Sequence, residues 1–213
     1  MKGLLIAGAG GHGKVVAEAA LATGRWERIA FVDDRHAQLS DVLGHPVLGG
    51  IDDASRFRAE YADAVVAIGN ARVRLHVMDR LKSEGFGLPL VIHPSAWVSP
   101  SAVLGDGTVV FAMAAVNACA VIGRGGIVNT GATVDHDCRL GDGVHVCPGA
   151  HVAGDVVLAD AVWVGIGASV TNGLHVGGDV VIGAGAVVVS DVENGVTVAG
   201  VPATVIKRHV RGE

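Results

Sequence analysis

A histidine between two aspartates is the part of this sequence best suited to chemistry. The triplet Asp135-His136-Asp137 interrupts a stretch of small and aliphatic residues. An imidazole changes its charge near neutral pH, so His136 is suited to accept a proton during a reaction. A carboxylate on either side can orient the ring and stabilise its charged form. We therefore predict that His136 is a general base; a solvated turn histidine is the alternative.

A second chemical signal lies near the start of the chain, where a glycine-rich turn follows an apolar run. Residues 4–7 are typical of a buried strand, and residues 8–13 match the spacing G-x-G-x-x-G, with Asp33 and Asp34 about 20 residues further on. Backbone N–H groups at the start of the following helix can hold a phosphate. The unit is too short for a full dinucleotide fold, so we predict a nucleotide-linked ligand. A turn needed only for packing is the alternative.

Composition limits the folds that can position these residues. Of 213 residues, 32 are Gly, 50% are hydrophobic and only 4% are aromatic. Glycine and β-branched residues are poor helix formers, which argues against a helical bundle. The six prolines and the lack of a three-residue glycine period exclude collagen, and the hydrophobic content excludes disorder. A β-rich globular protein with many tight turns remains.

Every sixth residue from Ile92 to Val188 is aliphatic. The 17 positions of this series are all Ile, Leu or Val. A small or aliphatic residue stands four places after each, and the positions one and three places after each are rich in Gly, Asp and Asn, which suit turns with positive φ. One short strand and one turn take six residues, so three such sides close a triangular coil of 18. The period predicts a parallel β-helix of between five and six coils.

The 18-residue coil places residues 18 apart next to each other on neighbouring coils. Gly154 therefore lies one coil beyond His136, where it leaves room for a substrate and where its N–H can face an oxyanion. His145, His151 and His175 occupy equivalent positions on three different sides of the prism. One chain cannot gather them around zinc, so we expect no metal; a zinc lyase with sites between chains is a distant alternative.

The first 90 residues follow another pattern. Strands are predicted at 4–7, 29–32 and 64–68, and helices at 15–20 and 71–84. This alternation is typical of a small parallel sheet. Basic residues become scarce after residue 90, which suggests a boundary there. We predict an α/β Rossmann-like domain at 1–90, the β-helix at 91–206 and a basic tail at 207–213 with Lys207, Arg208 and Arg211.

Six motifs are spread over nearly the whole chain. They are Gly-Gly-His-Gly-Lys-Val-Val at 10–16, Val-Asp-Asp at 32–34, Ala-Ile-Gly-Asn at 67–70, Ile-His-Pro-Ser-Ala at 92–96, Asn-Thr-Gly-Ala-x-Val-Asp-His-Asp-Cys at 129–138 and Gly-Val-Pro-Ala at 200–203. Together with the repeat they resemble the hexapeptide-repeat sugar O/N-acetyltransferases, which include UDP-4-amino-sugar N-acetyltransferases, GDP-perosamine N-acetyltransferase and sialic acid O-acetyltransferases. The resemblance implies a left-handed parallel β-helix and a homotrimer with acetyl-CoA sites between neighbouring prisms.

The resemblance also implies roles for individual residues. His136 is the general base and Asp137 assists it; some relatives have Glu in place of Asp137. Acetyl-CoA contacts are expected from Asn129, His145, Ile166 and Gly183, to which the coil register adds Gly154. The N-terminal unit is expected to bind a nucleotide sugar through Gly10, Gly11, His12, Asp33, Asp34 and Gly69. For His145, a structural role is the alternative.

The activity that the resemblance implies is transfer of an acetyl group from acetyl-CoA, a co-substrate, to the amine of a nucleotide-linked 4-amino-4,6-dideoxy sugar. We expect direct attack on the thioester, because Cys138 is expected in the core and neither Cys119 nor Cys147 has an obvious base. A sugar or sialic acid O-acetyltransferase and a non-catalytic trimer that binds nucleotide sugars are the alternatives. The sugar, its nucleotide and the choice of N or O stay open.

Charge and cysteine content bear on partners and compartment. The formal net charge of −5 argues against a nucleic-acid or acidic-membrane surface, and no apolar run is long enough to span a bilayer. An odd number of cysteines without a paired framework is typical of a reducing compartment. We therefore expect a cytoplasmic protein that binds neither nucleic acid nor membrane.

Overall fold

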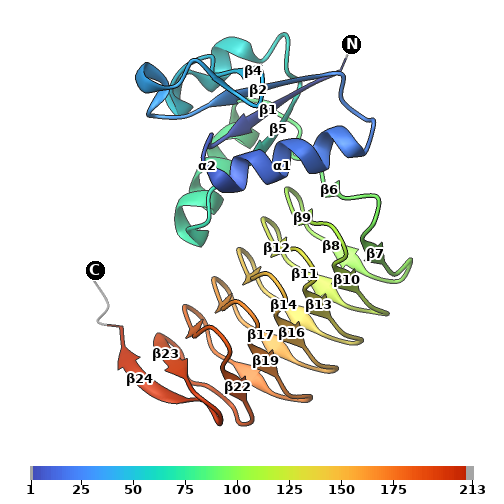
Figure 1. The fold of residues 1–213 in the computed structure, drawn as a ribbon, viewed down its shortest axis with the longest axis vertical. Coiled ribbons are helices and arrows are strands. Elements are labelled where there is room, and N and C mark those ends of the chain that lie inside the picture. Colours follow the sequence, from blue (N-terminus) through green and yellow to red (C-terminus); the bar gives the residue numbers. More distant parts are fainter. Residues whose placement is uncertain (1, 210–213) are drawn as a thin grey trace. The chain divides into compact units, whose positions relative to one another are not determined.

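The structure, a computed structural model, describes residues 2–209 and divides into two compact units. The α/β unit ends at Pro94, and the β-helix unit begins at Ser95 (Figure 1). None of the helices within residues 2–209 has the length and apolar character needed to cross a membrane.

The α/β unit contains the predicted strands and helices together with short elements that the sequence pattern did not indicate. Its elements are β1 (Gly3–Ala7), α1 (Gly11–Ala22), β2 (Arg28–Val32), the 3-10 helix η1 (His36–Gln38), β3 (Asp41–Val42), β4 (His45–Pro46), the 3-10 helix η2 (Ile51–Phe57), β5 (Asp63–Val66), α2 (Ala71–Ser83) and β6 (Val91–Ile92). Strands β2, β1 and β5 form the predicted parallel sheet, and their order is β2-β1-β5. The short elements between β2 and β5 lack the apolar periodicity by which strands and helices are found.

Helices cover both faces of this sheet. Alternate sheet residues such as Leu5 share a buried cluster with Met78 and Leu81 of α2. On the other face, a Cβ at Gly13 of α1 would lie 3.4 Å from the ring of Phe31. Burial on both faces explains why all five residues of β1 are apolar or glycine, and why β1 shows no alternation of polar and apolar residues.

The β-helix unit is a triangular prism of two-residue strands, and each face is named here after one of its strands. The β13 face contains β7 (Trp97–Val98), β10 (Ala115–Val116), β13 (Thr133–Val134), β16 (His151–Val152), β19 (Ser169–Val170) and β22 (Val187–Val188). The β14 face contains β8 (Val103–Leu104), β11 (Val121–Ile122), β14 (Arg139–Leu140), β17 (Val157–Leu158) and β20 (His175–Val176). The β15 face contains β9 (Val109–Val110), β12 (Ile127–Val128), β15 (His145–Val146), β18 (Trp163–Val164), β21 (Val181–Ile182) and β23 (Val196–Ala199).

The 18-residue register is confirmed. Thr133 pairs with His151, and Arg139 pairs with Val157, in parallel strands of successive coils. The second residue of each strand points inward, so that the aliphatic series from Val110 to Val188 is buried. Three edges join the faces: the first edge connects the β13 face to the β14 face, the second connects the β14 face to the β15 face, and the third connects the β15 face to the β13 face.

The turn positions of the repeat have two different requirements rather than the single one expected. The position three places after the inward residue has positive φ, as in Gly131 (65°) and Asp137 (60°). Glycines one place after the inward residue are required by close packing. A Cβ at Gly123, for example, would lie 2.7 Å from the backbone N of Asp142 on the next coil. The position with positive φ thus needs a residue that tolerates the left-handed region, whereas the closely packed glycines, such as Gly123, need the absence of a side chain.

The β-helix ends in an antiparallel pair of β23 with β24 (Thr204–Arg208). Lys207 and Arg208, which the sequence assigns to a basic tail, therefore belong to a strand, because they pair with the last strand of the β15 face. Arg208 also forms an ion pair with Glu193. Arg211 lies outside the described residues.

Candidate active site

His136 lies in the turn between β13 and β14, on the first edge of the prism. Its Nδ1 is 2.8 Å from Oδ2 of Asp137. Asp137 adopts φ of 60°, in the left-handed region that Asp tolerates better than most residues, and this conformation belongs to the turn. When Nδ1 donates its proton to the carboxylate, the lone pair of Nε2 is available to accept another proton. The imidazole is more than half exposed, so a substrate can reach it.

Asp135 has a different role from Asp137. Its Oδ1 accepts the backbone N–H of His136 at 2.8 Å and the side-chain amide of Asn117 at 3.0 Å. The two hydrogen bonds hold the pKa of Asp135 below its usual value. The expectation that both neighbouring carboxylates orient the imidazole is therefore corrected: Asp137 makes the hydrogen bond to the ring, and Asp135 organises the backbone and adds charge.

The local charges raise the pKa of His136 above its ordinary value. The hydrogen bond to Asp137 is the largest cause. Burial of the ring opposes it, and the negative charges of Asp135, Asp137 and Asp155 add to the raising effect. A raised pKa makes the imidazole a stronger base and stabilises the imidazolium that forms when it accepts a proton.

Gly154 lies against the imidazole, as the coil register predicts. A Cβ at this position would be 2.6 Å from both Cε1 and Nε2 of His136. No described residue accepts a hydrogen bond from the N–H of Gly154, whereas its carbonyl accepts the N–H of Gly173 at 3.0 Å. The absence of a side chain at Gly154 thus leaves room for the ring, and the backbone N–H of Gly154 is free of protein acceptors within the described residues.

The other predicted acetyl-CoA contacts lie at the third edge or on the β15 face beside it. Asn129 Nδ2 is 3.1 Å from Nε2 of His145, which is buried. Ile166 is exposed, and a Cβ at Gly183 would lie 3.0 Å from Cβ of Ala199. The first edge, with His136, and the third edge bound opposite sides of the β13 face. One chain therefore does not bring His136 and His145 together.

Sequence reasoning missed Trp163, which packs against His145. The two rings meet edge to face with their centroids 4.3 Å apart, and Trp163 pairs with His145 on neighbouring strands. The 18-residue register contained this signal, since Trp163 follows His145 by one coil.

The zinc and cysteine alternatives can be compared with the same geometry. His145, His151 and His175 lie on three different faces, as predicted. Within residues 2–209 there is no group of three or more histidine, cysteine, aspartate or glutamate side chains arranged for a metal ion. Cys138 is buried and its thiol donates to the Ala153 carbonyl, as expected for a core residue. Burial raises the pKa of Cys147 to about 11, the opposite of what a nucleophilic thiolate requires.

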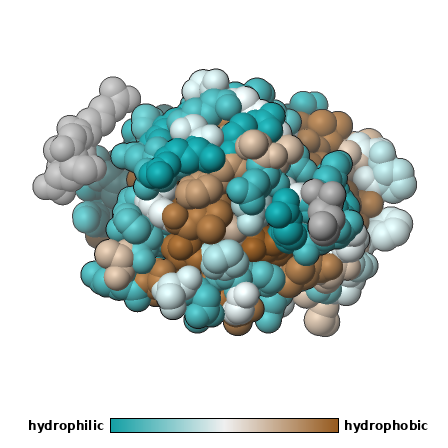
Figure 2. Space-filling view, turned by 90° about the horizontal axis from the view of Figure 1, so that it is seen from above, coloured by the Kyte–Doolittle hydropathy of each residue, from teal (hydrophilic) through white to brown (hydrophobic). Residues whose placement is uncertain are grey.

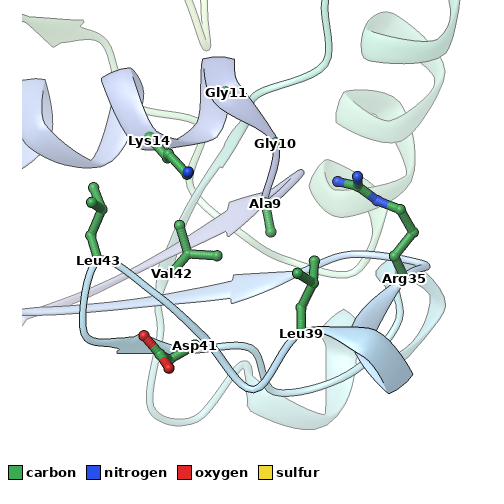
Figure 3. A pocket seen from close by; sticks show the side chains of 9 residues that line it. All are labelled: Ala9, Gly10, Gly11, Lys14, Arg35, Leu39, Asp41, Val42 and Leu43. Carbon is green, nitrogen blue, oxygen red and sulfur yellow. The ribbon is translucent and has the colours of Figure 1, made fainter.

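The α/β unit contains a cavity of about 400 Å³ beside the glycine-rich turn (Figure 3). Its lining residues come from this turn, from helix α1 and from the segment after β2: Ala9, Gly10, Gly11, Lys14, Arg35, Leu39, Asp41, Val42 and Leu43. Gly10 and Gly11 were predicted to bind substrate and do line the cavity. Arg35 and the lining residues after it were missed, because Leu39 directly follows η1 and Asp41, Val42 and Leu43 belong to the hairpin β3–β4, which carry no recognisable spacing. Leu43 is half exposed. Apolar residues also lie among polar ones on the surface that Figure 2 shows.

The glycines of the turn have separate functions. Gly8 adopts φ of 111°, and a Cβ at Gly13 would collide with the carbonyl oxygen of Gly8. A Cβ at Gly11 would meet nothing within 4 Å. Helix α1 begins after Gly10 without a side-chain cap and without an acidic residue in its first turn. Its first N–H groups, with Lys14 and Arg35 beside them, suit an anion such as a phosphate.

Both carboxylate oxygens of Asp33 accept hydrogen bonds from within the α/β unit. Its Oδ2 accepts the N–H of Ala9 at 2.8 Å, and its two oxygens accept the Nε and Nη2 of Arg35 at 3.0 and 3.1 Å. The bond to Arg35, with the backbone bonds, lowers the pKa of Asp33 to about 2. Asp33 thus holds the turn and aims Arg35 into the cavity (Figure 3).

The remaining residues predicted to bind substrate lie outside the cavity lining. Asp34 is exposed and accepts the N–H of Ile51 at 3.2 Å. His12 is partly buried in α1, and the carbonyl of Gly69 accepts a hydrogen bond from Arg74. The predicted substrate contacts of these residues stay predictions.

Known proteins resemble this chain in sequence. The family model of the PglD N-terminal domain matches residues 3–81. UDP-N-acetylbacillosamine N-acetyltransferase of Bacillus subtilis (strain 168) is 38% identical over 115 residues, which cover 53% of this chain and 52% of that protein. The match thus spans about half the length of this relative.

Solved structures match both units. The acetyltransferase domain of PglB from Neisseria gonorrhoeae FA1090, in complex with acetyl coenzyme A, is 46% identical with a TM-score of 0.93, over 96% of this chain and 99% of that chain. PerB from Caulobacter crescentus, in complex with CoA and GDP-perosamine, is 42% identical with a TM-score of 0.92, over 97% of this chain and 98% of that chain. WeeI from Acinetobacter baumannii AYE is 29% identical with a TM-score of 0.88, over 97% and 100% of the two chains.

Proposed function

Because this chain belongs to the hexapeptide-repeat sugar acetyltransferases, we propose that it transfers the acetyl group of acetyl-CoA to the amine of a nucleotide-linked 4-amino-4,6-dideoxy sugar. The observation that carries the proposal is the first edge, where Asp137 orients His136 and Gly154 leaves its Nε2 open. The named amino-sugar substrates of the B. subtilis and C. crescentus relatives support an amine as the acceptor.

In this mechanism His136 acts as a general base through Nε2. The amine nitrogen attacks the thioester carbonyl carbon while His136 accepts its proton, and Asp137 stabilises the resulting imidazolium. The C–N bond forms, the C–S bond breaks, and the proton passes from His136 to the departing thiolate of CoA. The N–H of Gly154 stabilises the negative charge on the carbonyl oxygen. The proposed transfer is direct and has no acyl-enzyme; Cys138 and Cys147 are buried, whereas Cys119 is exposed.

The cavity of the α/β unit holds the nucleotide in this proposal. The open N–H groups of α1, with Lys14 and Arg35, bind the diphosphate, and Leu39, Val42 and Leu43 offer apolar surface to the nucleoside. Three free cysteines fit a reducing compartment, so we propose a cytoplasmic location.

We propose a homotrimer with the active site between subunits. The base lies at the first edge, whereas Asn129, His145, Ile166 and Gly183 are at or beside the third edge. A neighbouring copy that presents its third edge to His136 would complete the site. Mixing equal amounts of the inactive variants His136→Ala and His145→Ala tests this. In randomly assembled trimers, about a quarter of the interfaces should combine an intact His136 with an intact His145 and regain activity. No recovery would reject a site shared between His136 of one subunit and His145 of another.

The assay that tests the activity measures CoA release with UDP- and GDP-linked 4-amino sugars and with sialic acids. We expect release with an amino sugar and an amide product, identified by mass spectrometry and by its stability to hydroxylamine. A hydroxylamine-sensitive ester would establish the O-acetyltransferase alternative. Nucleotide binding without CoA release from any acceptor would support the non-catalytic alternative.

A further inference from the structure

The order of the strands in the α/β unit creates a second position for a ligand beside the cavity. The sheet order β2-β1-β5 places β2 on one side of β1 and β5 on the other. In open α/β sheets, ligands bind outside the carboxyl ends of the strands where the strand order reverses. That position lies between the glycine-rich turn after β1 and the turn at 67–70 after β5, on the opposite side of β1 from Asp33.

The two turns begin side by side. Ala7 pairs with Val66, and the N–H of Ala67 donates to the carbonyl of Ala7 at 2.8 Å. A Cβ at Gly8 would lie 2.8 Å from the carbonyl oxygen of Ala67. The backbones of the two turns are therefore in close contact, and the position of one constrains the other.

A buried arginine is hydrogen-bonded to the turn at 67–70. Arg74 lies in the first turns of α2 and is only 1% exposed. Its Nη1 donates to the carbonyls of Ile68 and Gly69, both at 2.7 Å. Hydrogen bonds from a charged donor are among the stronger ones in proteins, and losing this donor would leave two carbonyls to be satisfied otherwise.

The guanidinium of Arg74 also affects the pKa of His12, which lies at the start of α1 in the glycine-rich motif. Burial and then the positive charge of Arg74 lower the pKa of His12 to about 4. Arg74 itself has a pKa lowered by burial to about 10, so it is charged at neutral pH. His12 is consequently neutral there, and its ring can act as a hydrogen-bond donor and acceptor but not as a cation.

We propose that Arg74 is a positioning residue for substrate binding, which holds Gly69 where the turn at 67–70 meets the glycine-rich turn and His12. The proposal rests on the proposed function, because it extends the nucleotide site of the cavity across the glycine-rich turn to the turn at 67–70. Burying a guanidinium is costly, and an apolar side chain of similar length would fill the same space at lower cost. Arg74 provides what such a side chain does not, namely two fixed donors and a positive charge between the turns.

Kinetics of Arg74→Met, Arg74→Lys and the control Arg72→Met test this role. Arg72 is an exposed residue on the same turn of α2. We expect Arg74→Met to raise KM for the nucleotide sugar at least tenfold, while kcat and KM for acetyl-CoA change less than twofold. Arg74→Lys, which keeps the charge and most of the length, should recover part of the affinity. Arg72→Met should match the wild type.

A purely structural role would give a different result. Arg74→Met would then lose activity only in proportion to its unfolded fraction, measured by thermal unfolding, and leave KM for the nucleotide sugar unchanged; that outcome overturns the proposal. If the methionine variant does not fold, the KM of Arg74→Lys decides, because a value equal to that of the wild type also overturns it.

Calorimetry with GDP and UDP separates this proposal from the proposed function. Binding of one nucleotide to the wild type, weakened at least tenfold in Arg74→Met, supports both. Equal binding by the wild type and Arg74→Met rejects the role of Arg74 alone. No binding of either nucleotide, or of the sugar substrates, by the wild type rejects the nucleotide-sugar function and the role of Arg74 with it.

Discussion

The β-helix unit positions its site by register, whereas the α/β unit positions its site by tertiary packing. In the β-helix, His136 and Gly154 are 18 residues apart and meet on neighbouring coils. In the α/β unit, Gly10, Arg35 and Leu43 line one cavity although no common spacing relates them. A repeat makes neighbours predictable, because each coil has the same number of residues. A sheet with loops of unequal length does not.

The glycines of the two units also have different functions. In the β-helix, Gly154 keeps space for the side chain of His136 on the preceding coil, and Gly195 provides positive φ. In the α/β unit, Gly13 allows helix α1 to approach the Gly8 carbonyl, and Gly11 faces open space. Substitutions by alanine therefore separate catalytic, structural and ligand-binding functions.

The largest expected effect comes from removing the imidazole of His136, the proposed base. His136→Ala should lower kcat by about 10²–10⁴-fold, the usual contribution of a general base, while binding of acetyl-CoA is largely retained. Steady-state kinetics and calorimetry with CoA measure the two effects. His175→Ala, an exposed histidine on the β14 face, is the control and should keep wild-type kinetics. Retention of wild-type turnover by His136→Ala would refute the register-based assignment.

The next effect tests whether the coil register controls the geometry of the base. Gly154→Ala should displace the imidazole and reduce kcat on the order of 100-fold, because misplacement of a catalytic group by about 1 Å has effects of this size. Gly195→Ala is the matched variant: its Cβ meets nothing, but φ of 67° should cost about 1–2 kcal/mol of stability.

Thermal unfolding and kinetics of this pair are expected to show opposite patterns. Gly154→Ala should lose activity at a nearly unchanged melting temperature, and Gly195→Ala should lose stability at nearly unchanged activity. Full activity in Gly154→Ala would mean that the imidazole has room elsewhere on the first edge.

A smaller effect is expected in the α/β unit and tests whether the glycine-rich turn serves a ligand. Gly11→Ala should fold normally, since a Cβ meets no protein atom, but raise KM for the nucleotide sugar about tenfold by obstructing the N-terminus of α1. Gly13→Ala should instead destabilise the unit through the clash with Gly8. Unchanged KM in Gly11→Ala would favour the alternative of a turn needed only for packing.

The smallest effect is a shift in pH dependence. His136 must be neutral to accept a proton, so kcat/KM should rise with pH through its pKa. Asp137→Asn removes the carboxylate that does most to raise this pKa. The acid limb of the profile should therefore move to lower pH, and the plateau should fall because the ring is less well oriented. An acid limb at the same pH would show that another group controls it.

The sequence predicted the β-helix more completely than the α/β unit. The inward series, the coil register, the contact between Gly154 and His136 and the core position of Cys138 all follow from the six-residue period. In the α/β unit, the strands, the helices and the glycine-rich turn were predictable from apolar runs and glycine spacing. The hairpin β3–β4 was not, because its two-residue strands have no periodicity.

Even within the β-helix, register alone did not assign every role. Asp135 and Asp137 are equivalent by spacing from His136, yet only Asp137 bonds to the imidazole. The reason is local: Asp137 has positive φ in the turn, and Asp135 is bonded to Asn117 and to the backbone of His136. Side-chain direction depends on backbone angles that a repeat pattern does not specify.

By itself, the sequence determined the class of fold, the coil register and the neighbourhood of His136 and Gly154, since these depend on local periodicity and on residue type. Only the tertiary structure decided that Asp33 is bonded to Arg35, that Arg74 is buried beneath the turn at 67–70, and that His136 and the predicted acetyl-CoA contacts Asn129, Ile166 and Gly183 lie on different edges. These facts depend on which distant segments meet, and that is set by the packing of the whole chain rather than by spacing along it.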